Sequence, residues 1–307
     1  MAEREFIARL LAPLAATAAA RGLADDAAVW MPPIGRSLVF THDVIAAGVH
    51  YLPDDPPSDV AWKLLAVNLS DLAAMAATPA GVLLGLGLSA AEDDAWREAF
   101  VGGLGRALES FDVCLWGGDT VSGLGQAVLG LTAIGWVEPG KVMGRSGARP
   151  GDELWVSGTI GGAMLGLAVA KGEAPFDKQL LNRFRRPTPR LALGRALGGA
   201  ATAGMDISDG LLIDADRLAA ASGVGLAIDL DAVPLPRAAA GLDDVLALVT
   251  AGDDYELLFT LPAGVRPPAG SGVALTRIGG VVAGAGVSLS FCGRPAVLPA
   301  RLGWEHG

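Results

Sequence analysis

Six short stretches of this chain place aspartate beside glycine, small residues or the apolar residues of strands. Several of these stretches adjoin apolar runs that we expect to form core. A carboxylate there is costly unless something positive neutralises it, so the fold needs cations at these points. The six stretches are Ala24-Asp25-Asp26, Thr41-His42-Asp43, Asn68-Leu69-Ser70-Asp71, Gly117-Gly118-Asp119-Thr120, Asp206-Ile207-Ser208-Asp209-Gly210 and Gly252-Asp253-Asp254-Tyr255-Glu256.

The residues that could form a soft metal centre are scarce, because the 307 residues include three histidines and two cysteines. Oxygen ligands without nitrogen or sulfur suit a hard cation such as magnesium, which in proteins commonly binds together with phosphates. The aspartate stretches therefore indicate magnesium and a phosphorylated ligand.

Composition excludes several other classes of protein. Hydrophobic residues make up 51% and charged residues 18%, which favours a folded chain over disorder. The net charge of -10 argues against a nucleic-acid surface. The opening Ala2-Glu3-Arg4-Glu5 lacks the positive region of a signal peptide, and no apolar run reaches the length of a membrane span. We expect a cytoplasmic protein in which Cys114 and Cys292 are reduced core residues.

Helix and strand patterns alternate along the chain, and the fold class they indicate is mixed α+β or α/β in two halves. A turn-rich connector at 144–152 leads us to place a first domain at 1–138 and a second at 139–307. In the first half we expect a helix containing Phe6 to Leu14, strands at Ser37–Phe40, Val82–Leu88, Val113–Trp116 and Gln126–Val137, and helices at Ser58–Ala77 and from Ser89 to about Ser110. In the second half we expect strands at Glu153–Ser157, Val224–Leu230, Tyr255–Leu261, Val273–Ile278 and Val287–Phe291, and helices reaching Lys171 and Ser222.

Each aspartate motif also has an ordinary structural interpretation. Asn68 and Asp71 lie three residues apart, hence on one face of the expected helix, which could simply be a solvent-facing stripe. Gly117–Thr120 follows an expected strand and could be a tight turn or a place where the backbone approaches a ligand closely. Ser208 or Asp209 can cap the following helix, and the same helix start can bind an anion. The pairs Asp25-Asp26 and Asp253-Asp254, taken alone, are typical of turns.

Two further segments could contact phosphate. The glycine loop Gly158-Thr159-Ile160-Gly161-Gly162 follows a strand, but it lacks the lysine of a P-loop. The segment 183–190 contains Arg183, Arg185, Arg186 and Arg190, and a solvated helix end followed by a proline-rich linker is its simpler interpretation.

The order and spacing of these motifs resemble the thiamine-monophosphate kinase family, within the aminoimidazole-ribonucleotide-synthetase-like ATP-binding superfamily. The similarity runs from about Gly22 to the terminal Gly303-Trp304-Glu305-His306. The most specific pieces, in order along the chain, are Ala66-Val67-Asn68-Leu69-Ser70-Asp71-Leu72-Ala73-Ala74-Met75, Gly117-Gly118-Asp119-Thr120, Arg145-Ser146-Gly147-Ala148-Arg149-Pro150-Gly151-Asp152, Asp206-Ile207-Ser208-Asp209-Gly210 and Asp253-Asp254-Tyr255-Glu256-Leu257-Leu258-Phe259.

The resemblance implies transfer of the γ-phosphoryl group of ATP to thiamine monophosphate, with several magnesium ions, in a homodimer whose N-terminal sheets close an intersubunit barrel. It implies a metal group of Asp26, Thr41, His42, Asp43, Asp71, Asp119, Asp206 and Asp209. It implies ATP contacts from Gly118, Asp119, Arg145 and Ser208, and contacts to thiamine monophosphate from His50, Asp253 and Trp304. Among these, Asp43, Asp71, Asp119 and Arg145 are the expected catalytic residues.

The chemistry of the residues agrees with such a transfer. An acceptor that is itself a phosphate has a second pKa near 6 and is largely ionised at neutral pH, so no general base is required. Repulsion between two polyanions opposes the reaction, and magnesium ions would screen it. Arg145 could stabilise phosphate charge, and Trp304 could stack on a cationic thiazolium or a pyrimidine ring.

Two alternatives remain at this point. The chain could be another synthetase of the superfamily, of the selenophosphate or aminoimidazole-ribonucleotide type, although the reactive cysteine of the former is absent from the N-terminal region. It could also be a nucleotide-binding relative without catalysis, because three positions depart from the family pattern. Family members usually have Gly at Ala24, Thr at His42 and Glu at Asp253.

Overall fold

The computed structural model of the chain describes residues 1–241, 244–270 and 272–305, so His306 of the C-terminal stretch lies outside the described residues. The chain forms two compact units, residues 1–72 with 78–139 and residues 73–77 with 140–307. Within the described residues, no helix combines the length and the apolar character needed to cross a membrane.

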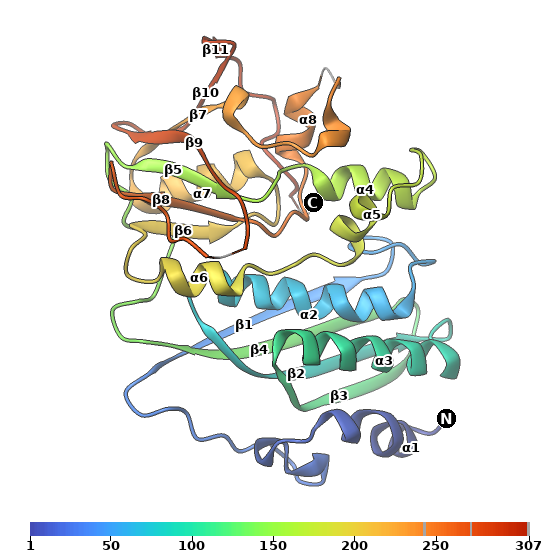
Figure 1. Cartoon of the computed structure of the whole chain (residues 1–307). Coiled ribbons are helices and arrows are strands. Elements are labelled where there is room, and N and C mark those ends of the chain that lie inside the picture. The colour runs from blue at the N-terminus through green and yellow to red at the C-terminus, as the bar shows by residue number, and fades with distance from the viewer. Residues whose placement is uncertain (242–243, 271, 306–307) are drawn as a thin grey trace. The chain divides into compact units, whose positions relative to one another are not determined.

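The first unit contains a four-stranded sheet in the order β1-β4-β2-β3, with α2 and α3 beside it (Figure 1). Only β2 and β3 run parallel. Leucines of α2 are fully buried, among them Leu64, Leu65 and Leu69. The elements of this unit are α1 (Glu3–Phe6), a π-helical stretch (Ile7–Leu11), two 3-10 stretches (Ala12–Leu14 and Ala18–Leu23), β1 (Ser37–Ala46), α2 (Pro57–Ala74), β2 (Thr78–Ser89), α3 (Asp94–Phe111), β3 (Cys114–Leu124) and β4 (Val128–Val137).

β1 is longer than expected, because it pairs with β4 along its whole length, from Ser37 opposite Val137 to Ala46 opposite Val128. The Thr41-His42-Asp43 stretch therefore lies inside a strand and does not follow one. Side chains alternate between the two faces of a strand, so Thr41 and Asp43 share one face of β1 and His42 lies on the other.

β3 is likewise longer than expected, so Gly117-Gly118-Asp119-Thr120 is part of a strand; the expectation of a turn there is wrong. Pairing with β2 explains the glycine at Gly118. A Cβ atom on Gly118 would lie 1.9 Å from the carbonyl oxygen of Leu84 in the neighbouring strand. The glycine is thus required by the close approach of two strands, whether or not a ligand binds there.

The expected start of the second long helix is also wrong. Ser89 does bond with Glu92, whose carboxylate accepts from the Ser89 amide (2.8 Å) and hydroxyl (2.7 Å). These bonds close a turn, and α3 begins after Asp93, whose side chain accepts from the Trp96 amide at 2.8 Å. A capping pattern was present twice, and the second copy caps the helix.

The second unit contains a sheet of seven strands in the order β11-β10-β7-β9-β5-β8-β6. An apolar core formed by these strands and α7 includes Val156, Leu212, Leu226 and Leu258. The elements of this unit are β5 (Glu153–Ser157), α4 (Gly162–Ala170), α5 (Lys178–Arg185), α6 (Leu191–Leu197), β6 (Ala203–Asp206), α7 (Leu211–Ser222), β7 (Gly225–Asp229), two 3-10 turns (Leu230–Ala232 and Arg237–Ala239), α8 (Val245–Thr250), β8 (Leu257–Leu261), β9 (Leu275–Val282), β10 (Gly286–Phe291) and β11 (Arg294–Ala296).

Several expectations for this unit are wrong. Gly210, with a φ of 128°, is the N-cap of α7, so neither Ser208 nor Asp209 caps it. β8 starts at Leu257, because Tyr255 has a φ of +50° and cannot continue an extended strand. Cys292 is an exposed free cysteine and not a core residue.

Candidate functional site

The candidates on the α2-facing side of β1 are brought together. The Thr41 hydroxyl donates to the Asp71 carboxylate, and the Asp43 amide donates to Oδ1 of Asn68 at 2.9 Å. Asn68 also donates to the carbonyl of Leu64 at 2.9 Å and is fully buried, so the solvent-stripe interpretation of this helix face is wrong. Asn68 therefore ties α2 to the β1 edge and places Asp71 beside the Thr41-Asp43 face.

A second group of candidates lines a cavity of about 690 Å³ in the same unit. Asp26, His42, Gly118 and Asp119 all border it, together with apolar side chains such as Trp116. The His42 ring nitrogen Nδ1 lies 2.9 Å from the Thr132 hydroxyl, and one Asp119 oxygen accepts from the Thr120 amide at 2.9 Å. The alternation of β1 thus divides the expected metal group, because His42 lies with Asp26 and Asp119 and not with Thr41 and Asp43.

His50 stands in the segment after β1. Its Nδ1 accepts from the Ala46 amide at 3.1 Å, so a neutral His50 ring carries its proton on Nε2. The buried Lys63, which is 1% exposed, donates from Nζ to the His50 carbonyl at 2.7 Å. The first bond orients the ring, and the second holds the main chain that carries it.

The donor set of the first unit suits magnesium by type, since it consists of carboxylates and a hydroxyl. Across 1–241, 244–270 and 272–305, no cluster of three His, Cys, Asp or Glu side chains is close enough to hold a metal ion. The Asp71 carboxylate accepts from the Thr41 hydroxyl, and the exposed Asp119 carboxylate accepts from the Thr120 amide. Both are oxygen donors of the kind that magnesium prefers.

Three segments that are far apart in sequence meet in the second unit. The Asp253 amide donates to the Ser208 carbonyl at 2.7 Å, and the Trp304 amide donates to the Asp209 carbonyl at 2.8 Å. The expected ATP and metal residues Ser208 and Asp209 therefore lie beside two of the three expected contacts of the acceptor, Asp253 and Trp304. The indole of Trp304 is 56% exposed and accessible for stacking.

The Ser208-Asp209 loop is held in place by Asp214 of α7. The carboxylate of Asp214 is fully buried and accepts from the amides of Ser208 (3.1 Å) and Asp209 (3.0 Å). Arg217 donates to both Asp209 and Asp214. Burial raises the pKa of Asp214, and the Asp209 charge adds to this, while Arg217 opposes it. The amides that could have bound an anion are thus occupied by a side chain that the sequence interpretation missed.

Asp206 and Arg145 complete the expected set in this unit. Asp206 ends β6 and is 4% exposed, so it has little contact with solvent. Arg145 is exposed, and its segment is anchored by Ser222, whose hydroxyl donates to the Arg145 carbonyl at 2.9 Å. Arg145 therefore presents a guanidinium to solvent from a fixed loop.

The turn that carries Asp253 has an unusual backbone. Asp253 has a φ of +71° and Tyr255 a φ of +50°, although neither is glycine. Left-handed residues of this kind cost about 1–3 kcal/mol each and persist where their surroundings enforce them. The Tyr255 amide donates to the Ile207 carbonyl at 2.8 Å, and the Tyr255 hydroxyl donates to Oδ1 of Asp253 at 3.0 Å.

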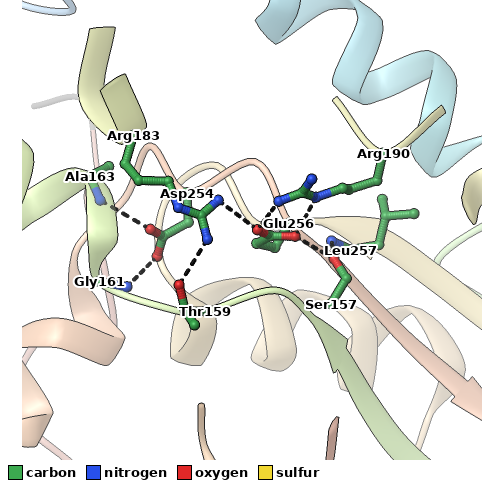
Figure 2. Close-up of polar contacts among 9 residues, drawn as sticks. All are labelled: Ser157, Thr159, Gly161, Ala163, Arg183, Arg190, Asp254, Glu256 and Leu257. Atoms are coloured by element: carbon green, nitrogen blue, oxygen red, sulfur yellow. Dashed lines mark hydrogen bonds and ion pairs between the residues drawn. The ribbon is translucent and has the colours of Figure 1, made fainter. Parts of the chain in front are cut away.

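Glu256, directly after this turn, is the centre of a buried ion-pair network (Figure 2). It accepts from Arg183 Nη1 at 2.8 Å, from Arg190 Nε at 2.6 Å and from the Ser157 hydroxyl at 2.5 Å. A Cβ atom on Gly158, where φ is +61°, would lie 2.0 Å from Glu256 Oε1, so only glycine fits there. Arg183 and Arg190 are therefore structural partners of a carboxylate, and the interpretation as a solvated helix end is wrong for both.

Asp254 occupies the start of α4. Its carboxylate accepts from the amides of Gly161 (2.6 Å) and Ala163 (3.3 Å), as Figure 2 shows. Burial raises the pKa of Asp254 to about 7, while the two amide bonds act in the opposite direction. The glycine loop 158–162 therefore binds a carboxylate of its own chain at the position where a phosphate cradle would need free amides.

Comparison with known proteins assigns the family. Residues 24–137 match the AIR synthase related protein, N-terminal domain, and residues 149–289 match the AIR synthase related protein, C-terminal domain. The thiamine-monophosphate kinase of Caulobacter vibrioides is 43% identical, over 99% of this chain and 91% of its own length. The chain belongs to the thiamine-monophosphate kinase family.

Solved structures of this kinase family share the fold. The thiamine-monophosphate kinase of Stenotrophomonas maltophilia K279a superposes with a TM-score of 0.81 at 39% identity, over 89% of this chain and 91% of that one. AaThiL, complexed with AMPPCP and TMP, superposes with a TM-score of 0.80 at 30% identity, over 100% and 99% of the two chains. The mixed α/β fold and the family resemblance expected from the sequence are confirmed.

Two departures from the kinase-family pattern can now be placed. Ala24 has a φ of -102°, so this position needs no glycine conformation. Asp253 does adopt a left-handed conformation and is bonded to Tyr255. The third departure, His42, lies on the cavity side of β1.

Proposed function

We propose that this member of the thiamine-monophosphate kinase family transfers the γ-phosphoryl group of ATP to thiamine monophosphate, giving thiamine diphosphate. The observation that supports it most directly is the convergence on the Ser208-Asp209 loop. Asp253 and Trp304, proposed for the acceptor, both donate main-chain hydrogen bonds to this loop, which is proposed for ATP and metal. The AaThiL complex with AMPPCP and TMP supports the choice of both substrates.

The acceptor side of the reaction needs orientation more than activation. The ionised acceptor phosphate is already a nucleophile, so no side chain has to remove a proton from it. His50, whose ring is oriented by the bond from the Ala46 amide to Nδ1, is the proposed contact of the acceptor phosphate. The Trp304 indole can stack on the cationic thiazolium, and the Asp253 carboxylate can attract the same ring.

On the side of ATP, the phosphoryl donor, the residues have to balance the negative charge of the phosphates. Arg145 offers an exposed guanidinium for the phosphates of ATP, and Gly118 and Ser208 are further proposed contacts. Magnesium, when bound, would offset the repulsion between the two polyanions. We propose that its ligands come from Asp26, Thr41, Asp43, Asp71, Asp119, Asp206 and Asp209. We leave the His42 ring out of this set, because a nitrogen ligand suits magnesium poorly.

We also propose a cytoplasmic homodimer that closes through the first sheet. Large apolar side chains are exposed on the outer face of this sheet, which is the face of β1 that carries His42. Among them are Phe40 at 61%, Val44 at 44% and Val121 at 52%. Large exposed apolar side chains gathered on one sheet can mark an interaction site. A second copy of the same sheet would cover it by symmetry.

The first test is ATP- and magnesium-dependent turnover with thiamine monophosphate, thiamine and selenide as parallel acceptors, analysed by chromatography of the products. Formation of thiamine diphosphate from the monophosphate alone would support the proposal. A product from selenide would instead identify a synthetase, and ATP binding without any turnover would identify a relative that binds nucleotide without catalysis.

A further inference from the structure

We propose that Asp254 and Glu256 are positioning residues that hold the Asp253 carboxylate where the acceptor substrate binds. This inference rests on the proposed function, because it takes Asp253 as a contact of thiamine monophosphate. It concerns two residues that do not themselves reach the substrate and that act through the backbone of the turn they flank.

Within the turn, Asp253 is the last partly exposed residue, and the three residues that follow it are buried. Asp253 is half-buried and bonds with the Tyr255 hydroxyl, whereas Asp254 is 6% exposed and Glu256 is fully buried. A carboxylate is rarely buried without strong partners, since desolvation penalises its charge. The two buried carboxylates that follow Asp253 fix the direction in which the turn presents the Asp253 side chain.

The turn needs such anchors because its backbone is strained at both Asp253 and Tyr255. The main-chain bonds of these two residues to Ser208 and Ile207 hold one side of the turn. A left-handed non-glycine residue persists only where its surroundings enforce it, so the buried side chains next to Asp253 and Tyr255 matter for the conformation of the turn.

Asp254 and Glu256 hold the other side of the turn. Figure 2 shows each of their carboxylates pointing toward several hydrogen-bond donors. Asp254 is held by the first amides of α4, and Glu256 by Arg183 of α5 and by Arg190. Arg183 links the two anchors, because it also donates from Nη2 to the Thr159 hydroxyl at 2.8 Å, in the loop that binds Asp254. A rotation of the turn would break several of these bonds at once.

The test is a double-mutant cycle on Asp253 and Glu256 in the full chain. Glu256→Gln keeps the size of the side chain but weakens both arginine contacts, and we expect it to raise KM for thiamine monophosphate by about tenfold. KM for ATP should change by less than about twofold. In an Asp253→Asn background, Glu256→Gln should change KM for thiamine monophosphate by less than about twofold, because the carboxylate that it positions is already gone.

Two further variants keep the test interpretable. Arg183→Gln leaves Arg190 on Glu256 and serves in the same cycle if Glu256→Gln does not fold, as judged by circular dichroism. Glu153→Gln is the matched control, because it breaks the ion pair with Arg277 (3.3 Å) in the same unit, in which the Arg277 side chain is 57% exposed. The control should leave both KM values within about twofold of wild type.

Each outcome decides between the inference and the proposed function. If the wild type makes thiamine diphosphate but the effects of Glu256→Gln and Asp253→Asn multiply, or if KM for ATP rises equally, the inference fails and the function stands. Titration calorimetry with thiamine monophosphate alone gives a second readout of the same cycle. If the wild type neither binds nor phosphorylates thiamine monophosphate, the proposed function fails, and the inference fails with it.

Discussion

The carboxylates of the two units are neutralised in different ways. In the second unit, Asp214 and Glu256 are fully buried, and arginine side chains of the same chain bind them. In the first unit, Asp71 is half-buried and Asp119 exposed, and they accept from a threonine hydroxyl and from a main-chain amide.

The difference separates structural aspartates from those suited to a ligand. The charge of a buried carboxylate that is fully paired with arginine is neutralised within the fold. An exposed carboxylate such as that of Asp119 is open to a cation such as magnesium. On this argument the first unit is the better place for metal binding, and the arginine network of the second unit supports the acceptor turn.

The largest expected effect is on stability and concerns Glu256. Replacing Glu256 with alanine leaves the guanidinium groups of Arg183 and Arg190 without their shared carboxylate in a largely buried site. We expect the free energy of unfolding to fall by about 3–5 kcal/mol, measured by urea denaturation. Glu153→Ala, which breaks a pair whose Arg277 side chain is 57% exposed, should cost about 1 kcal/mol or less. Equal losses in the two variants would contradict the structural role assigned to Glu256.

The second effect is a pH dependence of stability at Asp254. Its folded-state pKa of about 7 lies above the unfolded value of 3.8, so the folded state holds an extra proton between these values. Stability from this group is therefore full below about pH 4 and falls as pH rises to about 7, by up to about 4 kcal/mol. Urea denaturation from pH 4.5 to 8 should show this loss in the wild type relative to Asp254→Asn. Parallel pH profiles for the two proteins would exclude it.

The third effect is on activity and concerns Asp71. Asp71→Asn keeps the shape of the side chain and a hydrogen bond with Thr41, but it removes the ligand charge. We expect kcat to fall by about 100-fold or more while the melting temperature stays near that of the wild type. Raising the magnesium concentration should restore part of the rate if the loss is one of metal binding. Near-normal turnover in this variant would remove Asp71 from the metal group.

The smallest expected effect is on association, at the outer face of the first sheet. Phe40→Glu places a charge among exposed apolar side chains, and we expect the dimer to weaken by about 2 kcal/mol or more. Light scattering coupled to size-exclusion chromatography at several protein concentrations measures this. Arg277→Glu, which changes an exposed residue of the second unit, is the control. An unchanged mass for Phe40→Glu would exclude this face as the interface.

Much of the local structure follows from short-range pattern, and the sequence predicted it. β5 begins and ends as expected at Glu153 and Ser157, since an apolar run between polar turns has one stable conformation. Helix starts were less well predicted. Two overlapping capping patterns stood before α3, and Gly210 took the N-cap of α7, where Ser208 and Asp209 were the expected caps.

The sequence by itself determined the mixed fold class, the family resemblance and the set of candidate residues, because these depend on residue types, their order and their short spacings. Only the tertiary structure decided how the candidates are grouped. The length of β1 put His42 opposite Thr41 and Asp43, since one residue along a strand reverses the face. Glu256 pairs with Arg183 and Arg190, which lie 73 and 66 residues away in the sequence. Such pairings depend on the order of strands in the sheet and on burial, because a buried carboxylate without a partner is destabilising. Neither the strand order nor the burial can be read from a local sequence pattern.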